Sequence, residues 1–360
     1  MFLAGAFLVP TVHAQNVERH VLSGDDVAVY NLAGVARIEA GTGASVVVEV
    51  TRGGGDAGRL TIGKGPIRGR ETLRVIYPDD QVAYRPDAAA GGGARGNWWG
   101  SSNTELRVRD DGTFYDEGEN RGERGGWFRE GRRVRVGSSR GMDAHADIRV
   151  TVPAGKRFAL YLAVGRVMVS NVDGELRVDV GSADVTVDGT KGKLYVDTGS
   201  GEIRLTNAAG DMTLDTGSGM IRVAGVTGTS LVLDTGSGGV TAERVSVDAL
   251  KVDTGSGNVE LVGIRARDVL VDTGSGGVEL ELTSDVESLL VDTGSGGVTL
   301  RIPQSLGAEI DIETGSGGID LDFPVQLTRV SRDHVQGKIG DGRGSIRIDT
   351  GSGGVRLIRM

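Results

Sequence analysis

The sequence predicts an all-β protein that forms a single β-solenoid, or β-helix, with coils of about 18–20 residues and one loop-rich insertion. The first observation is the motif Asp-Thr-Gly-Ser-Gly, which recurs at intervals of 18 to 21 residues between positions 197 and 313. The second is an alternation of apolar and polar residues around each motif, which is typical of short strands. The third is a content of 61 glycines without a Gly-X-Y period, which excludes collagen. The perfect copies begin at Asp197, Asp215, Asp234, Asp253, Asp272, Asp292 and Asp349, and a variant copy begins at Glu313.

The coil around Asp234 illustrates how one repeat is expected to fold. Leu231, Leu233 and Thr235 alternate with outward residues, so these three side chains are expected to face the core. A Gly-Ser-Gly corner follows, and a second short strand begins at Val240. We expect the corner glycines to supply backbone angles that a Cβ would penalise. We expect the inward threonine hydroxyls to bond to one another along the stack.

The aspartates of the motif raise an electrostatic question, because stacked coils lie one strand spacing, ~4.8 Å, apart. Unit charges at this distance repel by about 0.9 kcal/mol even in water. We expect each carboxylate to accept N–H bonds from its own Gly-Ser-Gly corner, as in an Asx-turn. A bound cation such as Ca²⁺ is the alternative. Because the motif lacks the pattern of calcium-binding β-rolls, we predict no metal ion and no cofactor.

Pattern and composition divide the chain into four segments. Residues 1–14 are predicted to be an export signal, because the apolar run 2–9 is followed by Pro10 and a small residue, Ala14. Residues 15–80 are predicted to be irregular N-terminal β coils or a cap, and residues 146–360 the regular solenoid. Residues 81–145 are rich in glycine, charged and aromatic residues, and we expect a partly disordered insertion there. Within it, residues 106–109 and 113–115 are expected to pair as a small hairpin.

Charge and composition exclude several classes of function. The 40 basic and 49 acidic residues give a net charge of −9, which disfavours nucleic acid as a partner. No later stretch has the ~20 apolar residues of a membrane span. The chain has no cysteine, which excludes disulfides, thiol catalysis and a lipid-bearing cysteine. We therefore expect an exported protein of the periplasm, the cell surface or the extracellular medium.

The sequence contains no recognisable catalytic set. Asp-Thr-Gly-Ser is similar to an aspartic-protease motif, but that chemistry needs two carboxylates that face each other across one site. Here one aspartate per coil would form a column, and the four histidines are scattered singly. We predict no catalytic residues and no enzymatic activity. The alternative is a polysaccharide-acting enzyme on a β-helix, which would need an asymmetric cluster of acidic and basic side chains in a cleft.

The predicted binding residues are the three tryptophans of the insertion, Trp98, Trp99 and Trp127. Because loops that carry such residues commonly bind partners, we expect a protein or saccharide surface partner for this loop or for the rod. The chain ends shortly after the motif at Asp349. An uncovered terminal coil would expose a sheet edge, so self-association there is a further expectation.

The chain resembles the bacterial putative-adhesin family of β-strand-repeat domains, whose function is unassigned. The resemblance rests on the apolar start, on Ile148-Arg149-Val150-Thr151-Val152-Pro153 before the repeats, and on the serial Asp-Thr-Gly-Ser-Gly-Gly-Val pattern. It covers about residues 17–360, with residues 79–147 the least matched. It implies an exported β-solenoid of the cell envelope or surface, an adhesin or binding scaffold, and supplies no catalytic residues.

Overall fold

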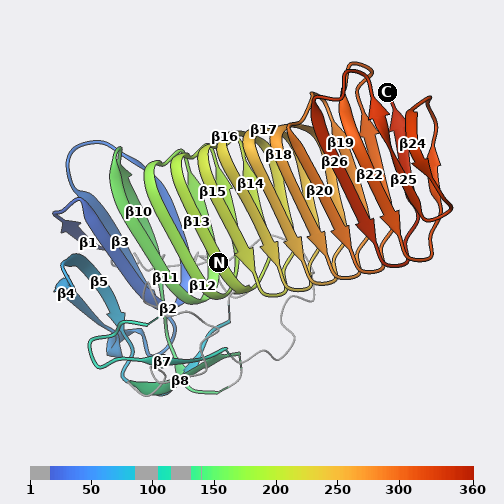
Figure 1. The fold of residues 1–360 in the computed structure, drawn as a ribbon. Helices are drawn as coiled ribbons and strands as arrows, with labels where there is room; N and C mark the ends of the chain where they lie inside the picture. Colours follow the sequence, from blue (N-terminus) through green and yellow to red (C-terminus); the bar gives the residue numbers. More distant parts are fainter. Residues whose placement is uncertain (1–16, 86–103, 115–130, 139) are drawn as a thin grey trace, which may run out of the picture.

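The computed structural model describes residues 17–85, 104–114, 131–138 and 140–360. In these residues the chain forms a long rod of stacked β coils, whose 23 strands belong to one continuous sheet (Figure 1). A small sheet of four strands lies beside the N-terminal coils. The described part contains one short 3-10 helix, η1 (Ala57–Arg59), and no α-helix. The prediction of an all-β solenoid is therefore confirmed.

The strands fall into four groups along the chain. The N-terminal strands are β1 (Val17–Leu22), β2 (Asp26–Gly41), β3 (Val46–Gly53), β4 (Thr61–Ile67) and β5 (Arg70–Ile76). The small sheet contains β6 (Gln81–Ala83), β7 (Thr104–Val108), β8 (Arg132–Gly137) and β9 (Met142–Asp143). The regular coils contain β10 (His145–Pro153), β11 (Lys156–Ser170), β12 (Asp173–Asp188), β13 (Lys191–Ser200), β14 (Ile203–Thr206), β15 (Ala209–Thr216), β16 (Ile221–Thr235), β17 (Val240–Thr254), β18 (Val259–Thr273), β19 (Val278–Leu282), β20 (Ser288–Thr293) and β21 (Val298–Ile302). The C-terminal strands are β22 (Ala308–Thr314), β23 (Ile319–Leu321), β24 (Gln326–Val330), β25 (His334–Ile339), β26 (Gly344–Thr350) and β27 (Val355–Arg359).

Neighbouring coils pair in parallel, with equivalent residues of the repeat directly beside one another. Asp215 pairs with Asp234, Asp234 with Asp253, and Asp253 with Asp272. Since side chains alternate between the two faces of a strand, an in-register stack sends the same positions of every repeat inward. The repeat in the sequence therefore becomes a set of continuous columns along the rod.

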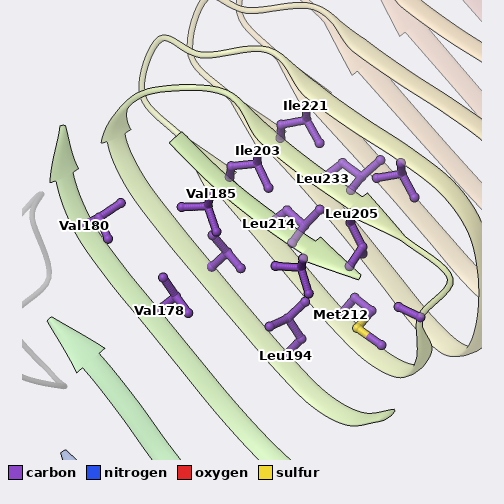
Figure 2. Close-up of a cluster of buried hydrophobic side chains, with 14 of the residues drawn as sticks. Val178, Val180, Val185, Leu194, Ile203, Leu205, Met212, Leu214, Ile221 and Leu233 are labelled. Atoms are coloured by element: carbon purple, nitrogen blue, oxygen red, sulfur yellow. The ribbon is translucent and has the colours of Figure 1, made fainter. Parts of the chain in front are cut away.

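The core of the rod consists of these inward columns. Figure 2 shows side chains from successive coils, among them Val178, Leu194, Met212 and Leu233, gathered inside the coils. Each of these four is at most 3% exposed. Full burial of such a side chain stabilises the fold by roughly 1.5–3 kcal/mol, so stacking offsets the lack of disulfides.

The corner glycines of the motif have a role different from the one expected. From Gly217 onward no motif glycine has a positive φ among the described residues, so the backbone angles there do not require glycine. Glycine is required because the backbones of neighbouring coils approach closely at this corner. A Cβ on Gly238 would lie 1.6 Å from the carbonyl oxygen of Gly219, and one on Gly276 would lie 1.8 Å from that of Gly257. Glycine at the end of each motif allows the coils to stack at this corner.

Positive φ angles occur instead at a second bend in the coils between residues 171 and 263, where glycine alternates with other residues. Equivalent positions on neighbouring coils have φ between 53° and 71°. Glycine takes this conformation freely and asparagine tolerates it, which explains most of the residues found there. The column contains Asn171, Gly189, Asn207, Gly225, Arg244 and Gly263.

The inward threonines bond to the backbone, so the expected hydroxyl-to-hydroxyl ladder is wrong. The Thr254 hydroxyl donates to the carbonyl oxygen of Gly238 in the preceding coil (3.0 Å). It also accepts from the N–H of Gly257 in its own corner (3.1 Å). Thr235, Thr273, Thr293 and Thr350 make the same two contacts. Buried backbone groups are costly to leave unpaired, and a hydroxyl beside two of them satisfies both.

The last coil in the sequence is not the last coil in space. β26 pairs in parallel with β20 on one side and β22 on the other, and β27 lies in the same way between β21 and β23. The dark-red β26 is accordingly placed between orange strands in Figure 1. The outer side of β22 is covered by β25, which pairs antiparallel with β22 and with β24. The hairpin β24–β25 closes this end of the rod and returns the chain to an interior position.

The expectation that the last coil exposes a sheet edge is therefore wrong. At this end of the described chain the outermost strands are β24, whose five residues are all exposed, and the three-residue β23, which pairs only with β27. Both are short, and the pairing of β24 with β25 shifts register between Leu327 and Arg329. Short, irregular and charged edge strands discourage pairing between molecules.

The small sheet of the insertion is anchored on the outer face of the first coils. Tyr30 of β2 and Tyr161 of β11 stack with ring centroids 4.5 Å apart, and Phe114 meets Tyr30 edge-on at 5.7 Å. Tyr161 pairs with Asp179, so these rings occupy the column that carries aspartate farther along the rod. The insertion thus covers the N-terminal end of that column.

The predicted hairpin within the insertion is wrong. β7 pairs antiparallel with β8, so residues 104–108 take residues 132–137 as their partner. The Arg109 N–H donates to the Thr113 carbonyl oxygen (3.0 Å), which closes only a turn after β7. Among the residues that the structure describes, no helix is long and apolar enough to cross a membrane.

Candidate functional site

The binding residues predicted from the sequence, Trp98, Trp99 and Trp127, lie outside the described residues. The export signal predicted at residues 1–14 also lies outside them. Both stay predictions. The described solenoid, however, carries two surfaces on which a site could be built: the aspartate column and a groove on the corner beside it.

The structure places the motif aspartates in one outward column. The register continues from Asp197 through Asp272 to Asp292, then to Asp349 of the inserted coil and finally to Glu313. The expected Asx-turn is not formed where the corner contacts are described. At Asp234, for example, the corner N–H of Gly238 donates to the Thr235 hydroxyl (3.0 Å), and not to the carboxylate.

Burial and mutual repulsion dominate the electrostatics of the column. Burial raises the pKa of Asp234, and the neighbouring charge of Asp253 raises it further. Burial, followed by the charges of Asp253 and Asp292, raises the pKa of Asp272. Within the described residues, no group of three or more His, Cys, Asp or Glu side chains is arranged to hold a metal ion. Around Asp253 the carboxylates of the column therefore repel one another, and the nearby Lys251 offsets only part of this repulsion.

Replacing Asp253 by asparagine is expected to stabilise the protein at pH 7, by roughly 0.5–1 kcal/mol. The pKa values of Asp234 and Asp272 are raised in the folded state. These two carboxyls therefore contribute favourably to the free energy of unfolding at pH values below the unfolded-state pKa, about 3.9. This contribution is lost as the pH rises through the folded-state values, because the column becomes fully charged. The gain of Asp253→Asn in denaturant titrations should therefore shrink as the pH falls through about 4, be absent at about pH 3, and shrink with added NaCl.

Asp188 supplies the matched control for this prediction. Hydrogen bonds from Thr206 and Asn207 lower the pKa of Asp188, so Asp188→Asn should destabilise the protein at pH 7. The contact that Asp253→Asn removes, Lys251 Nζ at 3.8 Å, is exposed and contributes little. A gain for Asp253→Asn that persisted at about pH 3 would show that charge repulsion is not its cause.

A groove of about 680 Å³ runs along the rod on the corner that follows each motif in the C-terminal half. Its floor consists, in spatial order, of Asn258, Gly277, Gly297, Gly354 and Gly318. Its wall consists of Glu260, Glu279, Thr299, Arg356 and Asp320 in the same order. The inserted last coil supplies Gly354 and Arg356, the fourth of the five residues in the floor and in the wall. The groove exists in this form only because that coil lies between the two others.

The floor glycines are not demanded by the stacking of the coils. A Cβ on Gly277 would meet nothing closer than 3.6 Å, and one on Gly297 nothing closer than 3.3 Å. For Gly318 no atom lies within 4 Å, and none of the floor glycines has a positive φ. Earlier coils carry Glu202 and Met220 at the equivalent position. Glycine here keeps the groove open, whereas glycine one residue earlier permits stacking.

The floor also presents backbone donors. Two short polar side chains in this column accept the N–H of the next coil: Asp184 Oδ1 accepts from Glu202 (3.0 Å) and Asn258 Oδ1 from Gly277 (3.0 Å). Gly277, Gly297 and Gly354 have no side chain to do so. Within the described residues, the N–H groups of Gly297, Gly354 and Gly318 consequently have no acceptor in the protein. All three residues are exposed, so these donors face the groove or solvent.

The wall is polar and carries net negative charge. Glu279 lies 3.5 Å from Arg301, and Asp320 lies 3.2 Å from Arg356. Of the charged residues that line the groove, Glu260, Glu279 and Asp320 are acidic and Arg356 is basic. The charged lining residues occupy one column on one side of the floor.

Sequence reasoning missed this groove, although one signal was visible. The residue directly after the motif is Glu202, Met220 or Asn258 in some repeats and glycine in others. Glycine at this position therefore varies between repeats, whereas the glycines within the motif do not. The position of Gly354 between Gly297 and Gly318 had no signal in the sequence, because it depends on where the last coil inserts.

Fold and groove together define the class of the protein: a β-solenoid repeat protein with an open polar groove along its axis. The family model Toastrack DUF4097, a domain of unknown function, matches residues 146–357, and the chain belongs to this family. The match covers more than half of the chain and begins where the regular coils begin. The resemblance to a family of β-strand repeats is confirmed.

Two further comparisons add little. The chain is similar to a crystal structure of a putative cell adhesion protein from Clostridium sporogenes, with 10% sequence identity. The similarity covers 96% of this chain and 100% of that chain, but its TM-score is 0.20, so no conclusion about fold or function follows from it. No curated protein matches the chain.

Proposed function

We propose that the protein is a non-enzymatic, adhesin-like binding scaffold of the cell envelope or surface, which holds a partner along its rod. The observation that carries this proposal is the open groove, with backbone donors along its floor and carboxylates along its wall. A stack of paired coils holds such groups at fixed intervals, which suits the recognition of an extended partner. The apolar run at residues 2–9, with Pro10 and Ala14 after it, supports export.

The arrangement of the carboxylates favours binding over hydrolysis. Glycosidases place two carboxyl groups on either side of the bond that they cleave. Here Glu260 and Glu279 are neighbours in one column, and Asp320 of that column is paired with Arg356. Their positions follow the repeat, as expected for a scaffold. The tryptophans of the insertion, Trp98, Trp99 and Trp127, stay a second predicted set of binding residues.

A retention assay tests the proposed function. Beads coated with the purified protein should be retained on cell envelopes or on a panel of immobilised glycans and envelope proteins. No reducing ends should appear in the supernatant on prolonged incubation. The protein recovered from the envelope or secreted fraction should begin at Gln15. Release of sugar products would identify an enzyme instead, and the absence of retention on every surface would contradict a binding role.

A further inference from the structure

We infer that the groove binds an uncharged or basic glycan chain, laid along the solenoid axis across the coils from Asn258 to Gly318. This inference rests on the proposed binding function and specifies the ligand of the groove. Three features of the groove support it: the spacing of the backbone N–H donors, the Asn258 side chain at one end, and the charge of the wall.

The spacing of the donors disfavours an extended polypeptide. The N–H groups of Gly297, Gly354 and Gly318 follow one another at the interval between coils, ~4.8 Å. In an extended peptide, groups that face the same side repeat only every two residues, at roughly 6.6–6.8 Å. A peptide laid along the groove would therefore lose register with the donors after the first contact. A chain of pyranose rings presents oxygen acceptors more densely and on each ring, so it can follow successive coils.

Asn258 shows how an acceptor oxygen fits into the groove. Its side-chain oxygen accepts the Gly277 N–H at 3.0 Å and closes the N-terminal end of the floor. The next three N–H groups along the floor belong to Gly297, Gly354 and Gly318. No side chain fills the equivalent space beside them, because the preceding floor residues are Gly277, Gly297 and Gly354. A ligand oxygen placed there would repeat the contact that Asn258 makes. An amide or hydroxyl oxygen suffices for this contact, and no charge on the ligand is required.

The wall selects against acidic ligands. The lining carries three carboxylates and one guanidinium. Asp320 is paired with that guanidinium at 3.2 Å and Glu279 with Arg301 at 3.5 Å, and Glu260 adds a further negative charge. A polyanion would meet like charge along the groove. Sugar hydroxyls and ammonium groups, in contrast, donate to carboxylates in short, strong hydrogen bonds. The groove therefore fits hydroxyl-rich neutral chains and amino-sugar chains.

The test places asparagine, the residue found at position 258, at two further positions of the groove floor. In the double variant Gly297→Asn and Gly354→Asn, each new amide can accept the next N–H as Asn258 does. The matched control is Gly263→Asn, at the second bend of a neighbouring coil, where Asn207 is already found at the equivalent position. All proteins are full-length and are compared first by thermal melting, which should change little.

Binding is then measured by calorimetry and by NMR with three probes: a β-1,4-linked glucose hexamer, the corresponding glucosamine hexamer, and an oligogalacturonate of the same length. We expect the two non-acidic probes to bind and to shift the amide signals of Gly297, Gly354 and Gly318. The double variant should lose at least about tenfold in affinity, as expected from the loss of one or more satisfied hydrogen bonds. Gly263→Asn should bind like the wild type. Asn258→Gly, which opens one more coil, should bind the hexamers at least as tightly.

Three results would overturn the inference: no binding of either non-acidic hexamer, equal affinity in a folded double variant, or preference for the oligogalacturonate. Binding of an extended polar peptide with shifts at the same amides would assign the groove to a protein partner instead. If beads coated with the double variant are still retained on envelopes, the binding function stands and only the assignment of the groove fails.

Discussion

Replacing Gly276 by alanine is expected to destabilise the solenoid by about 3 kcal/mol or more. A Cβ at this position would lie 1.8 Å from the carbonyl oxygen of Gly257 and 2.5 Å from its carbonyl carbon. Both atoms belong to the backbone of the neighbouring coil, so no side chain can rotate away to relieve the overlap. The coils would have to separate at the corner, which would stretch the parallel hydrogen bonds between them.

Gly277→Ala is the control for this prediction because it places the same methyl group one residue away. The nearest atom to that Cβ is 3.6 Å distant, so Gly277→Ala should change stability by no more than about 0.5 kcal/mol. Denaturant titrations followed by circular dichroism measure the difference. Hydrogen exchange should show the loss of protection first where β17 pairs with β18 and where β18 pairs with β19, since repeat arrays can open locally. Equal stability of the two variants would show that this close approach does not limit the fold.

Replacing Thr254 by valine is expected to destabilise the protein by roughly 2–3 kcal/mol. Valine has the same shape but no hydroxyl. The N–H of Gly257 would lose its acceptor, and the carbonyl oxygen of Gly238 would lose one donor. Thr254 is only 1% exposed, so water cannot readily replace the missing contacts.

Serine at the same position separates the two roles of the threonine side chain. Thr254→Ser keeps the hydroxyl and removes one methyl group, so its cost should be near 0.8 kcal/mol. The free energies of unfolding of the two variants should be compared under identical conditions. If valine were tolerated better than serine, packing of the methyl group and not the hydrogen bonds would explain the threonine column.

The coil, its corner and the direction of its side chains could all be predicted from the sequence. A motif repeated at a nearly constant interval implies parallel coils in register, and period-two alternation then decides that Leu233 faces inward and Asp234 outward. These predictions hold because they depend on local geometry and on burial of apolar area, which every repeat expresses in the same way.

The roles of the motif residues could be predicted only in part. Glycine was expected for its backbone angles and is needed for the contact between Gly276 and the coil before it. Aspartate was expected to satisfy the corner, yet threonine does so through its hydroxyl. In both cases the deciding atoms belong to a neighbouring coil or to the inside of the corner. A single repeat, considered alone, does not contain that information.

The β-solenoid fold, the residues of its core and the interruption of the repeat all follow from the sequence pattern. The order of the coils at the C-terminal end follows only from contacts between segments far apart in the chain. There the β24–β25 hairpin covers β22, and the last coil enters between β20 and β22. Repeats of the same pattern can pair with one another in any order, so their sequence order does not specify their order in space. The candidate groove depends on that order, because Gly354 lies between Gly297 and Gly318 in its floor, and Arg356 between Thr299 and Asp320 in its wall.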